Sequence, residues 1–343
     1  MLINMFKLLM IFLFCFFGLY SQEYKAVTIA FYNVENLFDC EDDLQTFDND
    51  FTPLGKLNWT EERLNFKLEK IAKTISLIGA SKTKRPPLLI GLCEVENKIV
   101  LERLVNQESL SNIDYGIVHY NSPDRRGIDT ALLYDRIFFK ILNSQKHRLE
   151  LFNELNETIH TRDQLCVSGY LDEELIYCIV NHWPSRRGGE KKSEPRRINA
   201  AELTNKIMDS IYSISRNANI IVMGDFNDNP NNKSFYEVLN SNGDITTTNN
   251  LYNPMEALYK KGIGSLGYRD QWSLFDQILF SKSLTDTIGW KCWKSNVYNA
   301  DFLKNRTGRY KGYPKRTFSG GRYTKGYSDH FPVYTYLIKK VFK

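Results

Sequence analysis

Apolar segments in this sequence stop abruptly at polar residues. The run 220–223 is apolar at consecutive positions, which is typical of a strand covered on both faces. It is followed at once by Gly224, Asp225 and Asn227. The stability of a buried strand does not require the polar side chains of Asp225 and Asn227. A strand of this kind needs a layer on each side, so the pattern predicts a layered α/β protein.

Further strand-like segments alternate with amphipathic helices. The strands are predicted at 27–32, 88–93, 130–134, 175–180, 277–280 and 333–338. In the segment 60–79 apolar residues recur every three or four positions, Thr60 can cap the helix and Gly79 can end it. A second helix is predicted from about Arg196 to Ile214. The order of elements predicts helices packed on the outside of sheets.

The composition of the chain and the lack of a linker-like segment favour one globular unit. The chain has 343 residues, of which 42% are hydrophobic and 13% aromatic, and this content is too high for a disordered protein. No stretch resembles a linker and no internal repeat is visible. We therefore expect a single catalytic domain over residues 22–343.

The N-terminus is predicted to be a signal peptide, residues 1–21. One Lys precedes an apolar run from Leu8 to Phe17 that is shorter than a membrane span, and Ser21 follows at a plausible cleavage point. A retained N-terminal anchor is the alternative. Removal of one Lys and no acid changes the formal charge from +5 to +4. We expect an exported protein, periplasmic or extracellular, that is monomeric and not inserted in a membrane.

The cysteines do not indicate a metal centre or a disulfide framework. The five that follow the signal peptide have no C-x-x-C spacing, and Cys93, Cys166 and Cys178 lie in strand-like apolar segments. We predict that these three are small buried hydrophobic residues.

Acidic, amide and histidine side chains stand at the ends of most predicted strands. They are Asn33, Glu35, Glu94, Glu96, His182, Asp225, Asn227, Asp276, Asp329 and His330. Strand ends of one sheet can meet at one edge, and oxygen ligands without cysteine suit a hard cation such as Mg²⁺. A cation of this kind beside a histidine is suited to phosphate ester hydrolysis.

The ordered motifs FYNVENLF, GLCEVEN, NHWPSR, MGDFND, FDQILF and YSDHFPV resemble the endonuclease/exonuclease/phosphatase superfamily, which includes deoxyribonuclease I. The closest likeness is to a secreted bacterial nuclease-like branch, and it spans residues 27–336. The resemblance implies a four-layer α/β sandwich, with two mixed β-sheets packed face to face and flanked by helices.

The resemblance also implies a metal site. Glu94 matches the principal metal-binding Glu, and Asn33, Glu35 and Asp329 match positions that help to hold or orient the metal or the phosphate. Mg²⁺ is the expected ion, with Mn²⁺ or Ca²⁺ as alternatives.

The remaining motif residues are implied to be catalytic. Asp225 and Asn227 match the pair that places the attacking water, and Asn227 also contacts the phosphate. Asp276 matches the carboxylate that pairs with His330, and His182 matches a histidine near the leaving group. Whether Asp225 or His330 takes the proton stays open.

Several other acids have weaker signals. Asp124 is the candidate partner of His182, and Asp129 is expected to support the start of a strand. Glu96 is either a second acid of the site or a residue at the start of a helix. The acidic segment 39–50 could bind Ca²⁺ but lacks the EF-hand spacing, so a solvated loop is favoured.

Two basic segments favour nucleic acid as the substrate. Residues 302–328 contain eight Lys or Arg, six Phe or Tyr and no acid. The second segment places Arg186, Arg187, Arg196 and Arg197 after His182, and Arg186 is the predicted phosphate contact beside Asn33 and Asn227.

The sequence therefore predicts a divalent-metal-dependent nuclease that cleaves DNA or RNA with little sequence preference. A phosphatase or phospholipid phosphodiesterase on the same catalytic frame is one alternative. A polyanion-binding protein without catalytic activity is the other.

Overall fold

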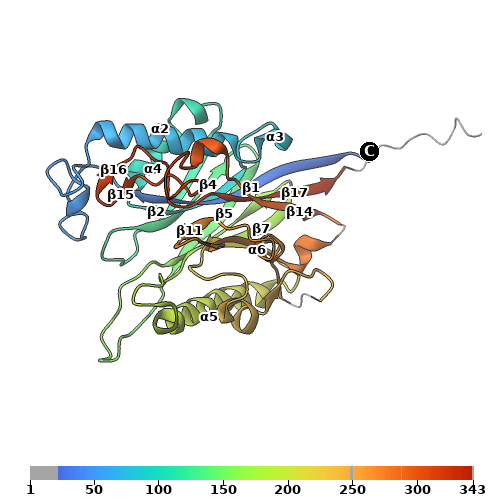
Figure 1. Ribbon diagram of the computed structural model, residues 1–343. Coiled ribbons are helices and arrows are strands. Elements are labelled where there is room, and N and C mark those ends of the chain that lie inside the picture. The colour runs from blue at the N-terminus through green and yellow to red at the C-terminus, as the bar shows by residue number, and fades with distance from the viewer. Residues whose placement is uncertain (1–21, 248–249, 287, 342–343) are drawn as a thin grey trace, which may run out of the picture.

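The computed structural model describes residues 22–247, 250–286 and 288–341, and the predicted signal peptide lies outside these ranges. Two β-sheets face each other in the middle of the molecule, and helices lie on the outer face of each sheet (Figure 1). The predicted four-layer α/β sandwich is confirmed.

The first sheet has six strands. They are β1 (Tyr24–Leu37), β2 (Leu89–Val95), β3 (Tyr115–His119), β4 (Asp129–Asp135), β14 (Trp290–Val297) and β17 (Val333–Lys340). Their order across the sheet is β14-β17-β1-β2-β4-β3. The sheet is mixed, because β1 runs parallel to β2 and antiparallel to β17.

The second sheet has seven strands. They are β5 (Phe139–His147), β6 (Gln164–Leu171), β7 (Glu174–His182), β8 (Asn219–Asp225), β9 (Ser241–Asn242), β10 (Leu251–Tyr252) and β13 (Asp276–Ser281). Their order is β5-β6-β7-β8-β13-β10-β9, with β7 parallel to β8 and antiparallel to β6. Two small hairpins stand apart from the sheets: β11 (Leu266–Tyr268) with β12 (Gln271–Ser273), and β15 (Phe318–Ser319) with β16 (Arg322–Tyr323).

The helices close the two outer faces. On one side lie α2 (Glu61–Leu77), α3 (Ala80–Thr83) and α4 (Lys98–Val105), and on the other lies α5 (Glu190–Ile214) (Figure 1). Thr60 caps α2 as predicted, since its side chain accepts from the Arg63 amide. The helix α5 starts before the predicted Arg196 and includes Pro195 in its second turn. Short helical segments complete the fold: Asn49–Phe51, Glu108–Leu110, Ser234–Val238, Met255–Tyr259 (α6), Lys282–Thr285 and Asp301–Leu303.

Three apolar clusters separate the four layers. Alternate residues of β1 belong to two different clusters. Ile29 and Phe31 lie in the cluster between the sheets, whereas Ala30 and Tyr32 lie in the cluster that faces α2. This double burial explains the uninterrupted apolar runs of the sequence. The third cluster lies between α5 and the second sheet.

Gly91 of β2 has no side chain, which allows the two sheets to approach each other closely at this position. A Cβ atom at this position would lie 2.7 Å from Met223 Sδ and 3.1 Å from a methyl group of Val180, both in the opposite sheet. The first of these contacts is shorter than real Cβ atoms make, so a larger residue at this position would require Met223 or the sheets themselves to shift.

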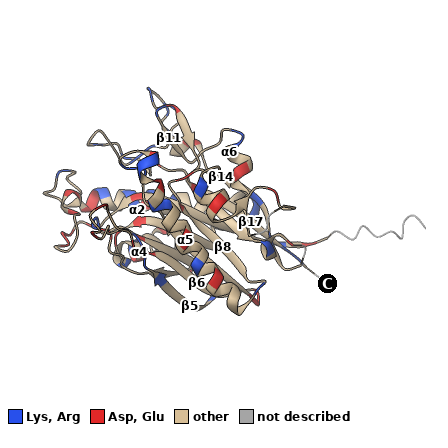
Figure 2. Cartoon of the chain, turned by 90° about the horizontal axis from the view of Figure 1, so that it is seen from below, with Lys and Arg blue, Asp and Glu red and all other residues tan. Residues whose placement is uncertain are grey.

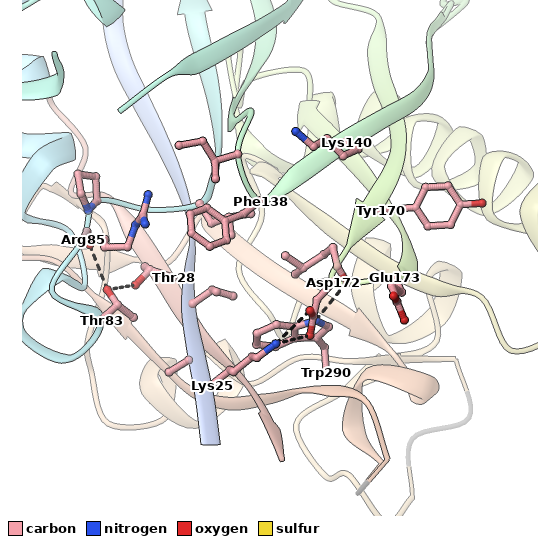
Figure 3. Close-up of a pocket in the computed structure, with 16 residues that line it drawn as sticks. Lys25, Thr28, Thr83, Arg85, Phe138, Lys140, Tyr170, Asp172, Glu173 and Trp290 are labelled. Carbon is pink, nitrogen blue, oxygen red and sulfur yellow. Dashed lines mark hydrogen bonds and ion pairs between the residues drawn. The ribbon is translucent and has the colours of Figure 1, made fainter. Parts of the chain in front are cut away.

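A cavity of about 910 Å³ lies at the end of the sandwich where β1 begins. Its lining is mainly apolar, with Phe138 and Trp290 on its walls and a Lys25–Asp172 ion pair at its edge (Figure 3). Asn33 and Glu35 lie near the other end of β1, so this cavity is remote from the predicted site.

Two further predictions can be compared with the described residues. Cys93, Cys166 and Cys178 are buried free thiols, as predicted. Among the described residues there is no helix of sufficient length and apolar character to span a bilayer.

Candidate active site

Three of the predicted site residues lie side by side at one end of the second sheet. His182 is opposite Asp225 in the parallel pair of β7 and β8. Asp225 is also opposite Asp276 in the antiparallel pair of β8 and β13. The pairing of three neighbouring strands therefore sets these side chains in a row.

The facing sheet contributes Asn33 and Glu94 through irregular strand ends. The register of β1 shifts between Asn33 and Leu37, and that of β2 shifts at Glu94, where a bulge interrupts the pairing with β4. Glu35 and Glu94 have positive φ angles of 50° and 61°. Such conformations are uncommon for residues other than glycine and often accompany functional sites.

Asn33 joins the two sheets. Its Nδ2 donates to Asp225 Oδ2 at 3.0 Å and to Glu94 Oε1 at 3.3 Å. Its Oδ1 accepts from the Glu35 amide at 2.9 Å, and the Asn36 amide donates to Glu94 Oε2 at 3.0 Å. Asn33 therefore orients the two carboxylates, and its own oxygen is already occupied.

His330 is held by Asp276. Its Nδ1 donates to Asp276 Oδ2 at 2.6 Å, and its Nε2 lies 3.9 Å from Asp225 Oδ2. Burial lowers the pKa of His330, but the charges of Asp276 and Asp225 outweigh burial and raise the pKa well above 6.5. This environment favours the protonated imidazolium form of His330.

His182 has the opposite protonation state. Burial, followed by the charges of Arg162 and Arg126, lowers the pKa of His182 well below 6.5. Its Nε2 lies 3.9 Å from Glu94 Oε1 and 3.8 Å from Asp225 Oδ2, whereas its buried Nδ1 has no hydrogen-bond partner. The imidazole is neutral and points into the carboxylate cluster.

The predicted pairing of His182 with Asp124 is wrong. The carboxylate of Asp124 binds Arg162 at 3.0 Å and Arg126 at 3.2 Å. Arg162 in turn donates to the main-chain oxygens of His182 and Trp183 at 3.2 and 2.5 Å. Asp124 thus supports the end of β7 through an arginine and does not contact the imidazole.

Glu35 and Asp329 share Arg316 at the edge of the site, and the buried Lys67 lies beside Glu35. Arg316 lies 3.3 Å from Glu35 Oε1 and 2.5 Å from Asp329 Oδ2. Lys67 is buried, donates to the main-chain oxygen of Glu35 and binds Thr317 Oγ1 at 2.7 Å. Burial and the charge of Asp329 raise the pKa of Glu35 to about 7, and burial lowers the pKa of Lys67 to about 8.

The charge of the site fits a divalent cation. With every group ionised, five carboxylates (Glu35, Glu94, Asp225, Asp276, Asp329) and three cations (Lys67, Arg316, His330) leave two negative charges. The surplus is smaller below about pH 7, because the pKa values of Glu35 and Asp225 are both raised to about 7. Burial raises the pKa of Asp225 to about 7, and the charge of Asp276 adds to the rise. An oxygen-rich cluster with this surplus suits a hard ion.

The ligand set favours an oxygen donor on Glu94. Within the described residues, two buried groups of three side chains have atoms close enough to share an ion: Cys93, His182 and Asp225, and Asp225, Asp276 and His330. Burial raises the pKa of the Cys93 thiol well above 9.0, which disfavours a thiolate ligand. The imidazolium of His330 is likewise unable to bind a metal. Arg316 compensates Glu35 and Asp329, so Glu94 is the carboxylate best placed for a cation.

The predicted phosphate contacts are only partly available to a substrate. Asn227 lies beside the site and donates from Nδ2 to Trp183 O at 3.0 Å. The guanidinium of Arg186 binds Asn227 O at 2.8 Å, Glu190 at 2.8 Å and Asp228 at 3.2 Å. Arg197 is fully buried and lies 2.7 Å from Asp228. These two arginines stabilise the loop that carries Asn227, and Arg197 cannot reach a polyanion.

The other acids have structural contacts. Asp129 binds His119 Nε2 at 3.1 Å and the Ser122 amide at 2.8 Å, in keeping with its expected support of a strand start. Glu96 accepts from the Asp39 amide at 2.6 Å and from Asn97 Nδ2 at 3.2 Å, so it contacts the acidic loop.

Sequence reasoning missed Lys67, Arg162 and Arg316. Lys67 had a visible signal, because it follows Leu64 by three positions and so falls on the apolar face of α2. Arg316 lies in the basic segment that was singled out, but nothing distinguished it from its neighbours. Arg162 had no signal.

A family model described as Endonuclease/Exonuclease/phosphatase family matches residues 28–339 of this sequence. No curated protein matches the sequence. Three solved structures illustrate the structural similarity. Humanized D. rerio TDP2 carrying 14 mutations has a TM-score of 0.57 and 14% identity, and the match covers 91% of this chain and 99% of that chain.

The other two structures have similar scores. D. rerio TDP2 complexed with a single strand DNA product has a TM-score of 0.54 and 14% identity, covering 91% of this chain and 98% of that chain. A mannosyl-6-phosphatase from Bacteroides thetaiotaomicron has a TM-score of 0.51 and 16% identity, covering 92% of this chain and 100% of that chain. Identities this low establish the shared fold alone.

Proposed function

This chain belongs to the Endonuclease/Exonuclease/phosphatase family, and we propose that it is an exported, divalent-metal-dependent phosphodiesterase that cleaves DNA or RNA. The observation that carries the proposal is the buried His330–Asp276 pair, set 3.9 Å from Asp225, which Asn33 links to Glu94 of the other sheet. An imidazolium, a carboxylate of raised pKa and an oxygen-rich cluster are the groups that hydrolysis of a phosphate ester requires.

Glu94 is the proposed metal ligand, with Asn33 orienting it and with Glu35 and Asp329 at the edge of the site. A bound divalent ion supplies positive charge to the phosphoryl and leaving oxygens. The net charge of minus two derived from the site residues supports one such ion, and Mg²⁺ remains the predicted one.

The side chains divide the proton transfers between them. Asp225, whose pKa is raised to about 7, accepts a proton from water as the water oxygen bonds to phosphorus. His330, as an imidazolium, donates a hydrogen bond to a phosphoryl oxygen. As the ester P–O bond breaks, His182, as a neutral imidazole, donates a hydrogen bond from Nε2 to the departing oxygen, which takes its proton from solvent. The sequence left open whether Asp225 or His330 takes the proton. The raised pKa of His330 supports Asp225 as the base, because a protonated imidazole does not accept a proton.

Nucleic acid is the proposed substrate because the basic segment 302–328 adjoins the site through Arg316 and Asp329. One of the structural neighbours is named as a complex with single strand DNA product, which is in keeping with this substrate. Another is named as a mannosyl-6-phosphatase, so a sugar phosphate is the competing substrate.

An activity panel tests the proposal. Plasmid, linear DNA, RNA, mannose 6-phosphate, inositol phosphates and sphingomyelin are incubated with and without EDTA. We expect nucleotide release that EDTA abolishes, and a loss of at least ~100-fold in Asp225→Ala and in His330→Ala with unchanged far-UV circular dichroism. Phosphate release from a small monoester without any cleavage of nucleic acid would refute the nuclease assignment.

The export prediction has its own test. Mass spectrometry of the protein from the periplasm and the medium should show a mature chain that starts near Gln22. A chain that retains residues 1–21 in the membrane fraction contradicts it.

A further inference from the structure

A second pocket, of about 640 Å³, opens directly beside Asp329. Three segments build it: the β11–β12 hairpin, residues 305–316, and the β15–β16 hairpin. Figure 2 shows the β11 hairpin projecting from the body of the molecule. Because Arg316 and Asp329 belong both to this pocket and to the carboxylate cluster, a molecule bound here touches the site of hydrolysis. We call it the tyrosine pocket.

One wall of the tyrosine pocket is a fixed aromatic stack. The ring of Tyr313 lies 5.4 Å from that of Trp272, which stacks on Phe331 at 6.0 Å and an angle of 14°. Tyr313 donates to Asp270 Oδ1 at 3.1 Å, and its hydroxyl accepts from the Asp270 amide at 2.8 Å. Gly267 permits this packing, since a Cβ there would lie 2.8 Å from the Tyr313 ring.

Two further tyrosines expose their rings at the edge of the tyrosine pocket. Tyr268 is 64% exposed and Tyr310 is 51% exposed, although both are large and largely apolar side chains. They lie on separate segments, the β11–β12 hairpin and the 305–316 loop. Exposed aromatic faces beside an active site are suited to stack on a flat ring of the substrate.

The charges around the tyrosine pocket favour phosphate. The guanidinium groups of Arg269 and Arg309 lie 5.2 and 5.9 Å from the rings of Tyr268 and Tyr310. Within the described part of the chain, neither group has an ion pair with a carboxylate. Both positive charges therefore remain available to an anionic ligand.

We propose that the tyrosine pocket binds one unpaired nucleotide adjacent to the phosphate that is cleaved. The base stacks on Tyr268 or Tyr310, and a neighbouring phosphate contacts Arg309. A pocket of this kind takes a single base, whereas a base pair would first have to open at a cost of a few kcal/mol. The protein therefore prefers single strands to duplexes. This inference rests on the proposed nuclease function and names the form of its substrate.

The test measures binding and cleavage separately. The full chain and the variants Tyr310→Ala and Tyr268→Ala are titrated in EDTA against a fluorescent single-stranded oligonucleotide, its duplex, and an abasic oligomer of equal length. Tyr310→Phe keeps the ring. Tyr236→Ala is the matched control, because Tyr236 is 49% exposed and is not among the lining residues of this pocket.

We expect the alanine variant that removes the ring on which the base stacks, Tyr310→Ala or Tyr268→Ala, to bind the single strand at least ~5-fold more weakly, the range set by stacking of one base. Binding of the abasic oligomer should be the same in wild type and variants, because no base is present to stack. Tyr310→Phe and Tyr236→Ala should match wild type. Arg309→Gln should reduce the salt dependence of binding to both oligomers by about one ion.

The outcomes separate this inference from the proposed function. Cleavage of nucleic acid with equal rates on single strands and duplexes, and no effect of the tyrosine variants, overturns the tyrosine pocket and leaves the nuclease function standing. Equal losses on the oligonucleotide and the abasic oligomer also overturn it. Hydrolysis of sugar phosphates with no cleavage of any nucleic acid removes both.

Discussion

His330 and Asp276 share a 2.6 Å hydrogen bond across 54 positions of the chain, and both side chains are buried. His330 forms an ion pair with the carboxylate of Asp276. The negative charge of Asp276 in turn raises the pKa of His330. The pair therefore behaves as one unit.

Asp276→Asn should lower kcat by about 100-fold or more, because the amide no longer stabilises the imidazolium of His330. The pKa of His330, followed by NMR of the ring protons, should fall. Asp163→Asn is the matched control, since Asp163 is also a buried carboxylate but pairs with Lys146. An unchanged pKa of His330 in Asp276→Asn would rule out this role.

Glu94→Gln should abolish binding of Mg²⁺ measured by calorimetry. In wild type, Mg²⁺ at a hundred times its dissociation constant should stabilise the folded protein by about 2.7 kcal/mol. This gain should vanish in Glu94→Gln and persist in Glu96→Gln, because Glu96 contacts Asp39 and Asn97 instead of the cluster. A full Mg²⁺ response in Glu94→Gln contradicts the assigned ligand.

The stability of the metal-free protein should depend on pH through Asp225. Its pKa is raised from 3.8 to about 7, so between these values the folded protein binds more protons than the unfolded chain. Stability therefore falls as pH rises across this window. In EDTA, Asp225→Asn should gain at least ~1 kcal/mol in urea unfolding at about pH 8 and nothing near pH 4. An equal gain at both pH values would show that the carboxylate charge is not the cause.

Lys67 and Glu35 should be coupled. Lys67→Met leaves the buried carboxylate of Glu35 without one of its two cations, and we expect a loss of about 3 kcal/mol in urea unfolding. The double variant with Glu35→Gln should lose less than the sum of the two single variants, by about 1 kcal/mol or more. Lys73→Met, on the exposed side of α2, should have little effect. Additive losses would mean that the two residues act independently.

The sequence predicted the central strands better than the edges of the sheets. The strands β1, β2, β7, β8 and β13 are buried on both faces, and their apolar runs made them visible. β3, β5, β6 and β14 were not among the predicted strands. β3, β5 and β14 lie at a sheet edge, and in the last two Lys140 and Lys294 face solvent and interrupt the apolar pattern. β6 lies inside the second sheet, where Ser168 and Gly169 interrupt its apolar run.

The motif residues of the site were found because they follow strands, and the structure brings Asn33, Glu94, Asp225 and His330 together. Their catalytic roles remain predictions. Pairings across loops could not be predicted, since a sequence does not reveal which loops meet in space. For this reason Asp124 was assigned to His182 when its partner is Arg162, and Arg316 was not distinguished within its segment.

The close fit at Gly91 has a consequence for how this protein can lose activity. Glu94 follows Gly91 on β2, and Asp225 follows Met223 on β8, so the gap between the two halves of the catalytic centre is set by an apolar contact that holds no reactive group. Filling that contact with a methyl group would press on Met223 and Val180 and alter the spacing of Glu94 and Asp225, while every charged residue of the site stayed intact. A comparison limited to the acids and histidines of the site would find nothing changed in such a protein, although its spacing had been altered from the interior.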